Sequence, residues 1–410
     1  MKIGKIIMLS MIGVGAMVSC SEDELGNDNK EYGTLQPVIG VYPGQDAGTS
    51  RAGETAKWRI YEELYPLALE DEPTIGIFMT QGNAPMNTIS GKFVYKMDDS
   101  FTPALPNWTS TIPVEDGTTY NIFGYMSANN TSWDASVTPN GTDYSTGAVM
   151  QLNNLEVVTA SDVSVVVGVL KGNMDDKNDD GVMRLTVENE GSEYGGTTKP
   201  SYLGSYSFVG EKDKNFIYLW LDHLYACINF ELTMDDNYGK LRIVKLKNVE
   251  LKVNSYKTYN VTVALGIDST DPIDNVHFEQ PEGAEKEITT ATLFQSVDGQ
   301  PIPLKSEGSE LNIPGYFAPA STFADTEQTI DVTFTYDLYS VKAGKEMKLV
   351  EAGRKATNKI NIGQLLQSGG HSEVKRGMLY TVRANIQPTY LYVLADEDLD
   401  NPTFELEVGD

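Results

Sequence analysis

Apolar residues in this chain fall mostly in short runs, and several runs alternate apolar and polar positions with a period of two. That period places one side of an extended segment on a core and the other in water. The runs are rich in β-branched and aromatic residues, and clusters of Gly, Asn, Asp, Ser and Thr separate them. We predict strands over residues 75–79, 93–95, 120–125, 163–167, 241–244, 259–263 and 330–336.

Helical periodicity is nearly absent from the chain. Residues 58–64 and 362–366 are each predicted to form a turn or two of helix, and Pro66 ends the first. Many short strands separated by regular turn signals are typical of β-sandwiches. The predicted fold class is therefore all-β, with two β-sandwich domains in tandem.

Composition suggests where the two domains divide. Residues 172–199 are loop-like and dense in Asp, Asn, Glu and Gly, whereas residues 216–232 form the longest strand-like run. We place the boundary between these segments. The N-terminal domain is expected over residues 52–212 and the C-terminal domain over residues 213–410, both of ordinary domain size.

Residues 20–51 differ from both domains because they are acidic, polar and Gly-rich, as expected for a flexible tether. An apolar island at residues 35–42 interrupts the tether and has the composition of a strand. Pro37 confines such a strand to a sheet edge or to its own first residues. Arg51 then follows among small residues, in a loop that suits the cleft of a trypsin-like protease.

The start of the chain has the features of an export signal. Two lysines precede an apolar stretch at residues 6–18, which is too short and too Gly-rich to span a membrane, and Cys20 follows a serine. We predict a lipoprotein signal peptide over residues 1–19, with lipid attached to Cys20. An ordinary cleaved signal with an incidental cysteine is the alternative.

The acidic run at residues 21–24 resembles the surface-export tag of Bacteroidota lipoproteins, and an acidic solvated linker is the alternative. Because two acyl chains anchor a protein durably, the precursor is expected at the outer membrane, held through Cys20. The formal net charge is -27, which disfavours nucleic acid and anionic lipid surfaces as partners. Cys227 is the one cysteine after Cys20, and we expect it to be a small buried hydrophobe.

No combination of residues typical of an enzyme stands out, and no cofactor is predicted. The three histidines lie far apart in sequence, and His223, in an apolar strand, is expected to be structural. Residues 175–180 resemble part of a calcium-binding loop, but Val187 stands where a bidentate glutamate belongs, so a solvated turn is the main alternative. The 22 tyrosines are interpreted as sheet and core residues, with a glycan site as the alternative.

Several segments, in this order along the chain, resemble the fimbrillin family, the type V pilins of Bacteroidota. They are residues 74–80, Trp108, residues 120–126, residues 221–230 and residues 376–382. The resemblance implies two transthyretin-like Greek-key β-sandwiches exported as a lipoprotein. It also implies that a trypsin-like protease at the cell surface cleaves after an arginine, here between Arg51 and Ala52, and that this cleavage releases the first strand of the N-terminal domain.

In that family mechanism, a C-terminal strand of another subunit fills the groove left by the released strand. The residues expected to occupy the groove before cleavage, as a placeholder strand, are Leu35, Val38, Ile39 and Val41. The candidate donor strand carries Phe404, Leu406 and Val408, which alternate with acidic residues at a period of two. Residues 378–394 are a second candidate for the donor, and a plain edge strand closing the C-terminal domain is the alternative reading of residues 404–408.

The predicted function is therefore that of a structural subunit, a stalk or tip pilin, of an extracellular fimbria that supports adhesion. Its expected partners are other pilin subunits, in a homo- or hetero-polymer, and the processing protease. The alternative from a different class is a monomeric surface lipoprotein that binds host glycan or protein.

Overall fold

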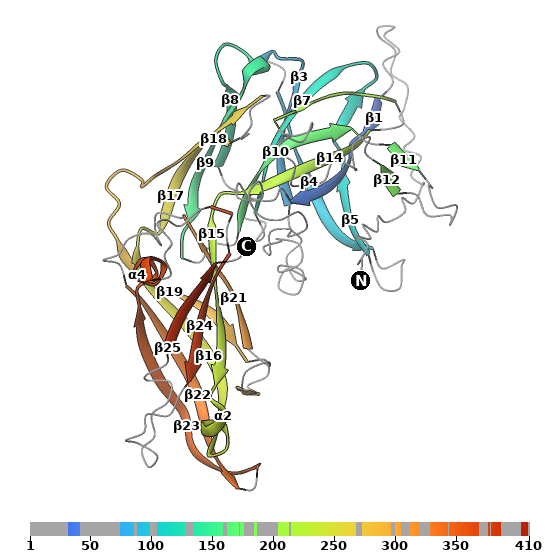
Figure 1. Cartoon of the computed structure of the whole chain (residues 1–410). Helices are drawn as coiled ribbons and strands as arrows, with labels where there is room; N and C mark the ends of the chain where they lie inside the picture. Colours follow the sequence, from blue (N-terminus) through green and yellow to red (C-terminus); the bar gives the residue numbers. More distant parts are fainter. Residues whose placement is uncertain are drawn as a thin grey trace.

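The computed structural model of the chain is shown in Figure 1. It describes residues 32–41, 74–85, 88–98, 105–127, 134–158, 162–171, 173–175, 184–186, 204–212, 215–267, 273–296, 300–304, 311–319, 329–342, 344–368, 376–377, 379–386 and 403–408. Strands dominate these residues, so the predicted all-β fold class is confirmed. The predicted helix at residues 58–64 lies outside the described residues.

The largest sheet has eight strands in the order β2-β14-β10-β7-β3-β4-β5, with β13 joined to β7. Their bounds are β2 Gln36–Val41, β14 Phe216–His223, β10 Val163–Lys171, β7 Thr119–Ser127, β3 Thr74–Gln81, β4 Thr88–Asp98, β5 Leu105–Ser110 and β13 Ser207–Val209. β2 also contacts β5 at the opposite end, so the sheet curls until its two ends meet. A small sheet of β1 (Tyr32–Thr34) and β6 (Pro113–Glu115) adjoins β2 along the chain.

A four-stranded sheet in the order β18-β17-β9-β8 lies against the outer face of the curled sheet, and together they form the first sandwich. The bounds are β18 Ile273–Glu279, β17 Thr258–Gly266, β9 Gly147–Glu156 and β8 Asp134–Pro139. A short 3-10 helix, η3 (Tyr144–Thr146), precedes β9, and β11 (Asn173–Asp175) pairs with β12 (Arg184–Thr186) as a separate hairpin.

The second sandwich packs the sheet β21-β15-β24-β25 on the sheet β19-β16-β22-β23, to which β20 is joined. The bounds are β21 Leu311–Ala318, β15 Ala226–Met234, β24 Leu379–Ile386, β25 Thr403–Val408, β19 Glu287–Gln295, β16 Arg242–Ser255, β22 Ile330–Lys342, β23 Lys345–Ile360 and β20 Ile302–Pro303. The helices α2 (Asp236–Gly239) and α4 (Ile362–Ser368) belong to this sandwich, and α4 confirms the helix predicted at residues 362–366. Figure 1 shows the two sandwiches end to end.

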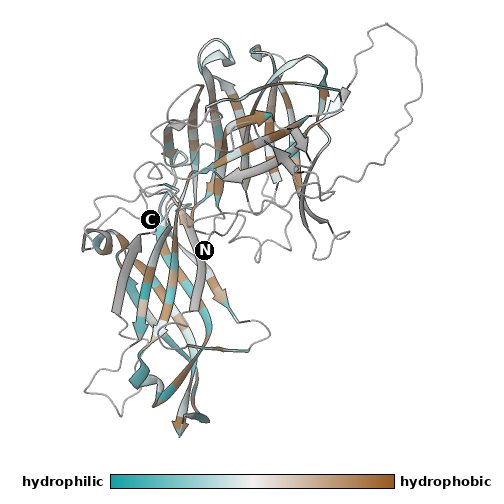
Figure 2. Ribbon diagram, turned by 45° about the vertical axis from the view of Figure 1, so that its right-hand side comes forward, coloured by the Kyte–Doolittle hydropathy of each residue, from teal (hydrophilic) through white to brown (hydrophobic). Residues whose placement is uncertain are grey.

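Alternation of side chains explains how the curled sheet buries both of its faces. In β3, Ile75, Ile77 and Met79 point into the curl, where they join a buried cluster with Ile217 and Leu219 of β14. Residues of the opposite parity in β7 and β14, such as Phe123 and Trp220, pack towards the four-stranded sheet instead. Figure 2 shows the same alternation of apolar and polar residues along the strands of the second sandwich. Burying both faces requires long apolar runs, which the sequence has at residues 163–167 and 216–232.

Strands from both sides of the expected boundary at residues 212 and 213 share sheets. β14 lies in the curled sheet beside β10, and β17 pairs with β9 from Thr258↔Glu156 to Gly266↔Gly147. The chain therefore enters the second sandwich at β15, returns to the first for β17 and β18, and leaves it again at β19. The domain limits remain a prediction, and the sheets themselves interleave across the predicted boundary.

Candidate functional site

Residues 32–41, called here the leader segment, are part of the first sandwich. β1 pairs antiparallel with β6, with Gly33 opposite Val114, and the N–H of Leu35 donates to the carbonyl of Ile112 at 3.3 Å. The Leu35 side chain is 1% exposed and belongs to the buried cluster inside the curl. The apolar island read from the sequence thus supplies strands, and Pro37 is the second residue of β2, as its ring requires.

β2 runs parallel to β14 at one end of the curled sheet. Its register places Val38 opposite Tyr218, Ile39 opposite Leu219, and Val41 opposite Leu221. Parallel pairing between these strands is unusual in a sheet whose other pairs are antiparallel. In the sheet order β2 is the terminal strand, so it covers the hydrogen-bonding edge of β14 over residues 216–221.

The edge beneath β2 has the properties of an acceptor for an added strand. β14 contributes three fully buried residues to the interior of the curl, Ile217, Leu219 and Leu221, each with 0% exposure. Ile112 and Val114 lie on the β6 side of the same cluster. Without the leader segment, a ladder of N–H and C=O groups would face an apolar groove, which is the arrangement that binds an extended peptide by β-augmentation.

Gly33 lies tightly against the body of the sandwich. A Cβ atom at this position would lie 2.5 Å from the carbonyl oxygen of Lys212 and 2.8 Å from that of Glu211. Asn215, 1% exposed, braces this loop by donating to the Glu211 carbonyl and accepting from the Glu211 N–H. The leader segment therefore fits a shape that is fixed by backbone atoms.

The candidate donor strand is β25, which contains Phe404, Leu406 and Val408. It pairs antiparallel with β24, from Asn385↔Thr403 to Tyr380↔Val408. It is the terminal strand of its sheet, and β24 is its one neighbour in that sheet. The structure thus places β25 as an edge strand of its own sandwich. Exchange of this strand between subunits stays a prediction. The second candidate, residues 378–394, includes β24, which is an inner strand between β15 and β25.

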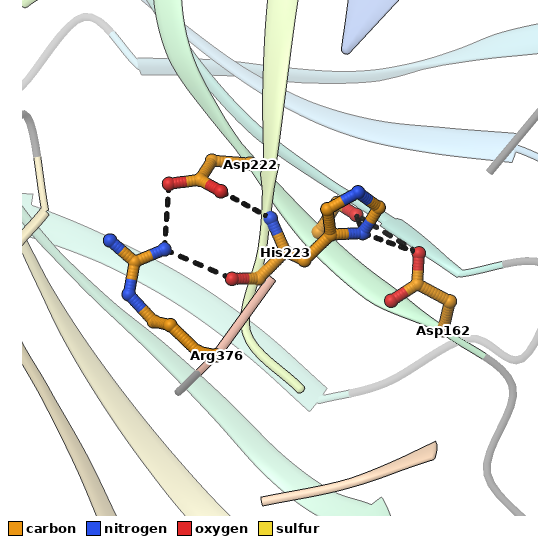
Figure 3. A network of polar contacts seen from close by, with 5 residues as sticks. Asp162, Asp222, His223 and Arg376 are labelled. Carbon is orange, nitrogen blue, oxygen red and sulfur yellow. Dashed lines mark hydrogen bonds and ion pairs between the residues drawn. The ribbon is translucent and has the colours of Figure 1, made fainter. Parts of the chain in front are cut away.

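A buried polar network lies where β14 passes into β15 (Figure 3). Arg376, which precedes β24, donates to the Asp222 carboxylate at 2.6 Å and to the His223 carbonyl at 3.1 Å. The Nδ1 atom of His223 lies 2.8 Å from Oδ2 of Asp162, and Ser164 is 3.4 Å from that same oxygen. The network joins β10, β14 and the chain that enters β24, so it ties the two sandwiches together.

The sequence predicts that His223 is structural, and its burial among these hydrogen bonds agrees with that prediction. In the sequence, Asp222 and His223 belong to one segment of the fimbrillin resemblance and Arg376 belongs to another. Nothing in the sequence spacing indicates that residues 154 positions apart form an ion pair. The sequence signal that could have found them is the charged Asp222 inside an otherwise apolar strand, because a buried charge is costly unless it is paired.

Several predicted site residues lie outside the described residues. These are the lipidation site Cys20, the cleavage site at Arg51 and Ala52, and residues 176–180 of the calcium hypothesis, all of which stay predictions. Within the described part of the chain, no three His, Cys, Asp or Glu side chains gather closely enough to hold a metal ion. No helix among those residues is both long and apolar enough to cross a membrane.

No family model and no curated protein matches the sequence. Among solved structures, the chain is similar to a fimbrial protein of Bacteroides vulgatus at 12% identity and a TM-score of 0.40, covering 93% of this chain and 99% of that chain. A candidate cell adhesion protein of Bacteroides uniformis matches at 11% identity and a TM-score of 0.39, covering 94% and 99%. One of Bacteroides fragilis matches at 9% and 0.38, covering 92% and 97%. The structural neighbours are thus fimbrial and candidate cell adhesion proteins.

Proposed function

We propose that this chain is a structural subunit, a stalk or tip pilin, of a surface fimbria. It is exported as a lipoprotein anchored at Cys20, is cleaved by a trypsin-like protease between Arg51 and Ala52, and polymerises by exchange of strands between subunits. The observation that carries the proposal is the pairing of β2 with the edge of β14 over an apolar interior. The role is structural and adhesive, with no catalytic step.

Two kinds of interaction, side-chain burial and ladder hydrogen bonds, hold the leader segment against the rest of the sandwich. Burial of the Leu35 side chain contributes on the order of 1.5–3 kcal/mol, and each ladder hydrogen bond adds about 0.5–1.5 kcal/mol net. Cleavage after Arg51 leaves these contacts in place but makes them intermolecular, so the leader segment becomes replaceable. A donor strand of the same length gains the same ladder, and β2 and β25 both have six residues.

Cleavage also separates the assembled subunit from its lipid. Cys20 stays with the leader segment, so the body that begins at Ala52 is free to leave the outer membrane and enter an extracellular fimbria. The acidic surface that disfavours nucleic acid and anionic lipid agrees with an external location.

The proposal is tested with Arg51→Ala and the matched control Arg51→Lys, in protein that begins at residue 21. Brief treatment with trypsin should cleave the unmodified protein and Arg51→Lys, and filaments should then appear by negative-stain electron microscopy. Arg51→Ala should remain monomeric. Filaments from uncleaved Arg51→Ala would refute the requirement for processing. Cleaved protein that stays monomeric would favour the alternative, a resident surface lipoprotein that binds host glycan or protein.

A further inference from the structure

β19 is a terminal strand of the sheet β19-β16-β22-β23 in the second sandwich. It pairs antiparallel with β16, from Ser255↔Glu287 to Asn248↔Gln295, and within the described part of the chain β16 is its only ladder partner. β21 of the facing sheet comes close to β19 but pairs with β15 instead. One edge of β19 therefore presents backbone N–H and C=O groups with which no described strand pairs.

The sequence of β19 lacks the features that usually prevent an exposed edge from pairing with another chain. Such edges are protected by prolines, by charged residues or by short strands. Residues 288–295 of β19 contain neither a charge nor a proline, counting histidine as neutral. In the other terminal strands of the four-stranded and five-stranded sheets such runs reach at most four residues, at 135–138 in β8, 275–278 in β18 and 315–318 in β21.

The side chains of β19 also favour the addition of a strand. Five of the seven residues 288–294 are β-branched or aromatic, the types that strands prefer. Segments of this length with high β-propensity, low charge and no proline pair readily with other chains. Ile288 is 73% exposed, the largest value among the large apolar residues described as exposed. Thr290 and Thr292 are exposed too and share its face, because side chains alternate with a period of two.

A second copy of this chain supplies a strand that matches this edge. The formal net charge of -27 makes two copies repel each other over most of their surfaces, whereas the uncharged run in β19 lets them approach with no like charges opposed. When two β19 strands pair antiparallel about a two-fold axis at Thr290, Ile288 lies opposite Thr292, and Thr289 lies opposite Ala291. Thr290 then faces Thr290 of the other copy, and threonine pairs of this kind stabilise sheets.

We propose that β19 binds β19 of a second copy of this chain, so that the two five-stranded sheets become one continuous sheet across the contact. A two-fold contact uses the same surface on both molecules, so each edge covers the other and neither stays open. The neutral edge gives a charged peptide nothing to pair with, and an equally neutral strand fits it best. The contact involves neither β2 nor β25, and it is therefore independent of the proposed strand exchange.

The test uses protein of residues 21–410 that carries Arg51→Ala, so that the proposed processing and filament growth do not contribute. Sedimentation velocity over a range of protein concentrations should show an equilibrium between monomer and dimer. Thr290→Glu places two carboxylates opposite each other at the two-fold axis and should raise the dissociation constant of the dimer at least about tenfold. This variant should keep its own fold, because Lys252 lies opposite Thr290 in β16. The matched control, Thr138→Glu on the exposed surface of β8, should change the constant by less than about twofold.

A mixture of Thr290→Glu with Thr290→Lys tests the register of the contact. Each variant alone should be mostly monomeric, and the equal mixture should form heterodimers, because opposite charges then face each other. Thermal melting by circular dichroism first establishes that both variants are folded. Unmodified Thr290 protein that stays monomeric at every concentration, a dimer that Thr290→Glu leaves intact, or a mixture that stays monomeric would overturn the inference. None of these results bears on strand exchange, which is tested separately by filaments from cleaved protein with Arg51 in place.

Discussion

Arg376 and Arg383 form ion pairs of the same kind in different surroundings, and their comparison gives a prediction for single residues. The carboxylate of Asp222, paired with Arg376, is 1% exposed, whereas Glu231, paired with Arg383 at 3.2 Å, is 18% exposed and Arg383 itself 45%. Arg376→Ala should lower the free energy of unfolding by about 3–5 kcal/mol, because it leaves a buried charge. Arg383→Ala should lower it by less than about 1 kcal/mol. Urea unfolding measures both, and equal losses would contradict the assigned role of the polar network.

Gly33 gives a second prediction for a single residue. A methyl group at this position meets two backbone carbonyl oxygens, which cannot move aside, so Gly33→Ala should loosen β1 from β6. The cost expected for such overpacking is about 1–3 kcal/mol. The matched control is Gly239→Ala, where the added methyl meets only the end of the flexible Met234 side chain, at 3.3 Å. Hydrogen exchange of residues 32–41 should speed up in Gly33→Ala alone, and unchanged exchange would show that the fit is not tight.

The sequence predicts the burial of a single residue where the chemistry of that residue alone is decisive. Cys227 is predicted to be buried, and its exposed fraction is 0%. Gly33 could not be recognised, because its tight fit depends on a loop 178 positions away in the chain, at Glu211. Local chemistry predicts burial, but it does not predict which distant backbone lies against a residue.

The position of β25 allows a prediction for a whole element. Because β24 is its one neighbour in the sheet, deletion of residues 403–410 removes an edge strand. The core described for the second sandwich draws on inner strands, among them β15, β16, β22 and β24. We expect the deletion variant to unfold cooperatively, with a somewhat lower midpoint, and to form no filaments after trypsin treatment. A variant that lacks only residues 409–410 is the control.

Two other outcomes of that deletion would have clear meanings. Filaments from the variant would exclude β25 as the donor and would leave residues 378–394 as the candidate. Loss of the cooperative transition would show that β25 is part of the fold of its own sandwich, as the plain edge-strand alternative states. Thermal melting by circular dichroism and electron microscopy of the same sample separate these cases.

Strands were predictable because alternation is a local property. The runs predicted at residues 75–79, 120–125 and 330–336 all lie within strands, β3, β7 and β22. Their partners were not predictable, since period two shows that a strand has two faces but not which neighbour pairs with it. The parallel pairing of β2 with β14, and that of β15 with β24, join segments far apart in sequence. Those pairings place β2 along the edge of β14 and leave β25 at the end of its sheet, beside β24.

For the whole molecule, composition predicts where a loop-rich stretch of the chain ends, but it does not predict which strands share a sheet. The loop-rich stretch that ends near residue 200 suggested a boundary, yet β14, β17 and β18 lie beyond it and belong to the first sandwich. Gly147 marks how closely the crossing strands meet, because a Cβ atom there would collide with the backbone of Leu265. When two separate stretches of the chain build one β-sandwich, the amino-acid composition does not mark the points where the chain enters and leaves that sandwich.

This interleaving predicts how fragments of the chain behave. A fragment of residues 20–212 keeps the leader segment but lacks β14, β17 and β18, so β10 and β9 lose the strands paired with their edges, and both buried clusters lose the side chains that β14 and β17 supply. Exposure of that much apolar surface should prevent folding, and circular dichroism should show no cooperative thermal transition. Mixing it with residues 213–410, which supply the three missing strands, should restore a transition and yield a complex by size-exclusion chromatography. A cooperative transition from residues 20–212 alone would mean that these residues form a complete domain, as the predicted boundary states. β17 and β18 would then not be needed for that domain to fold.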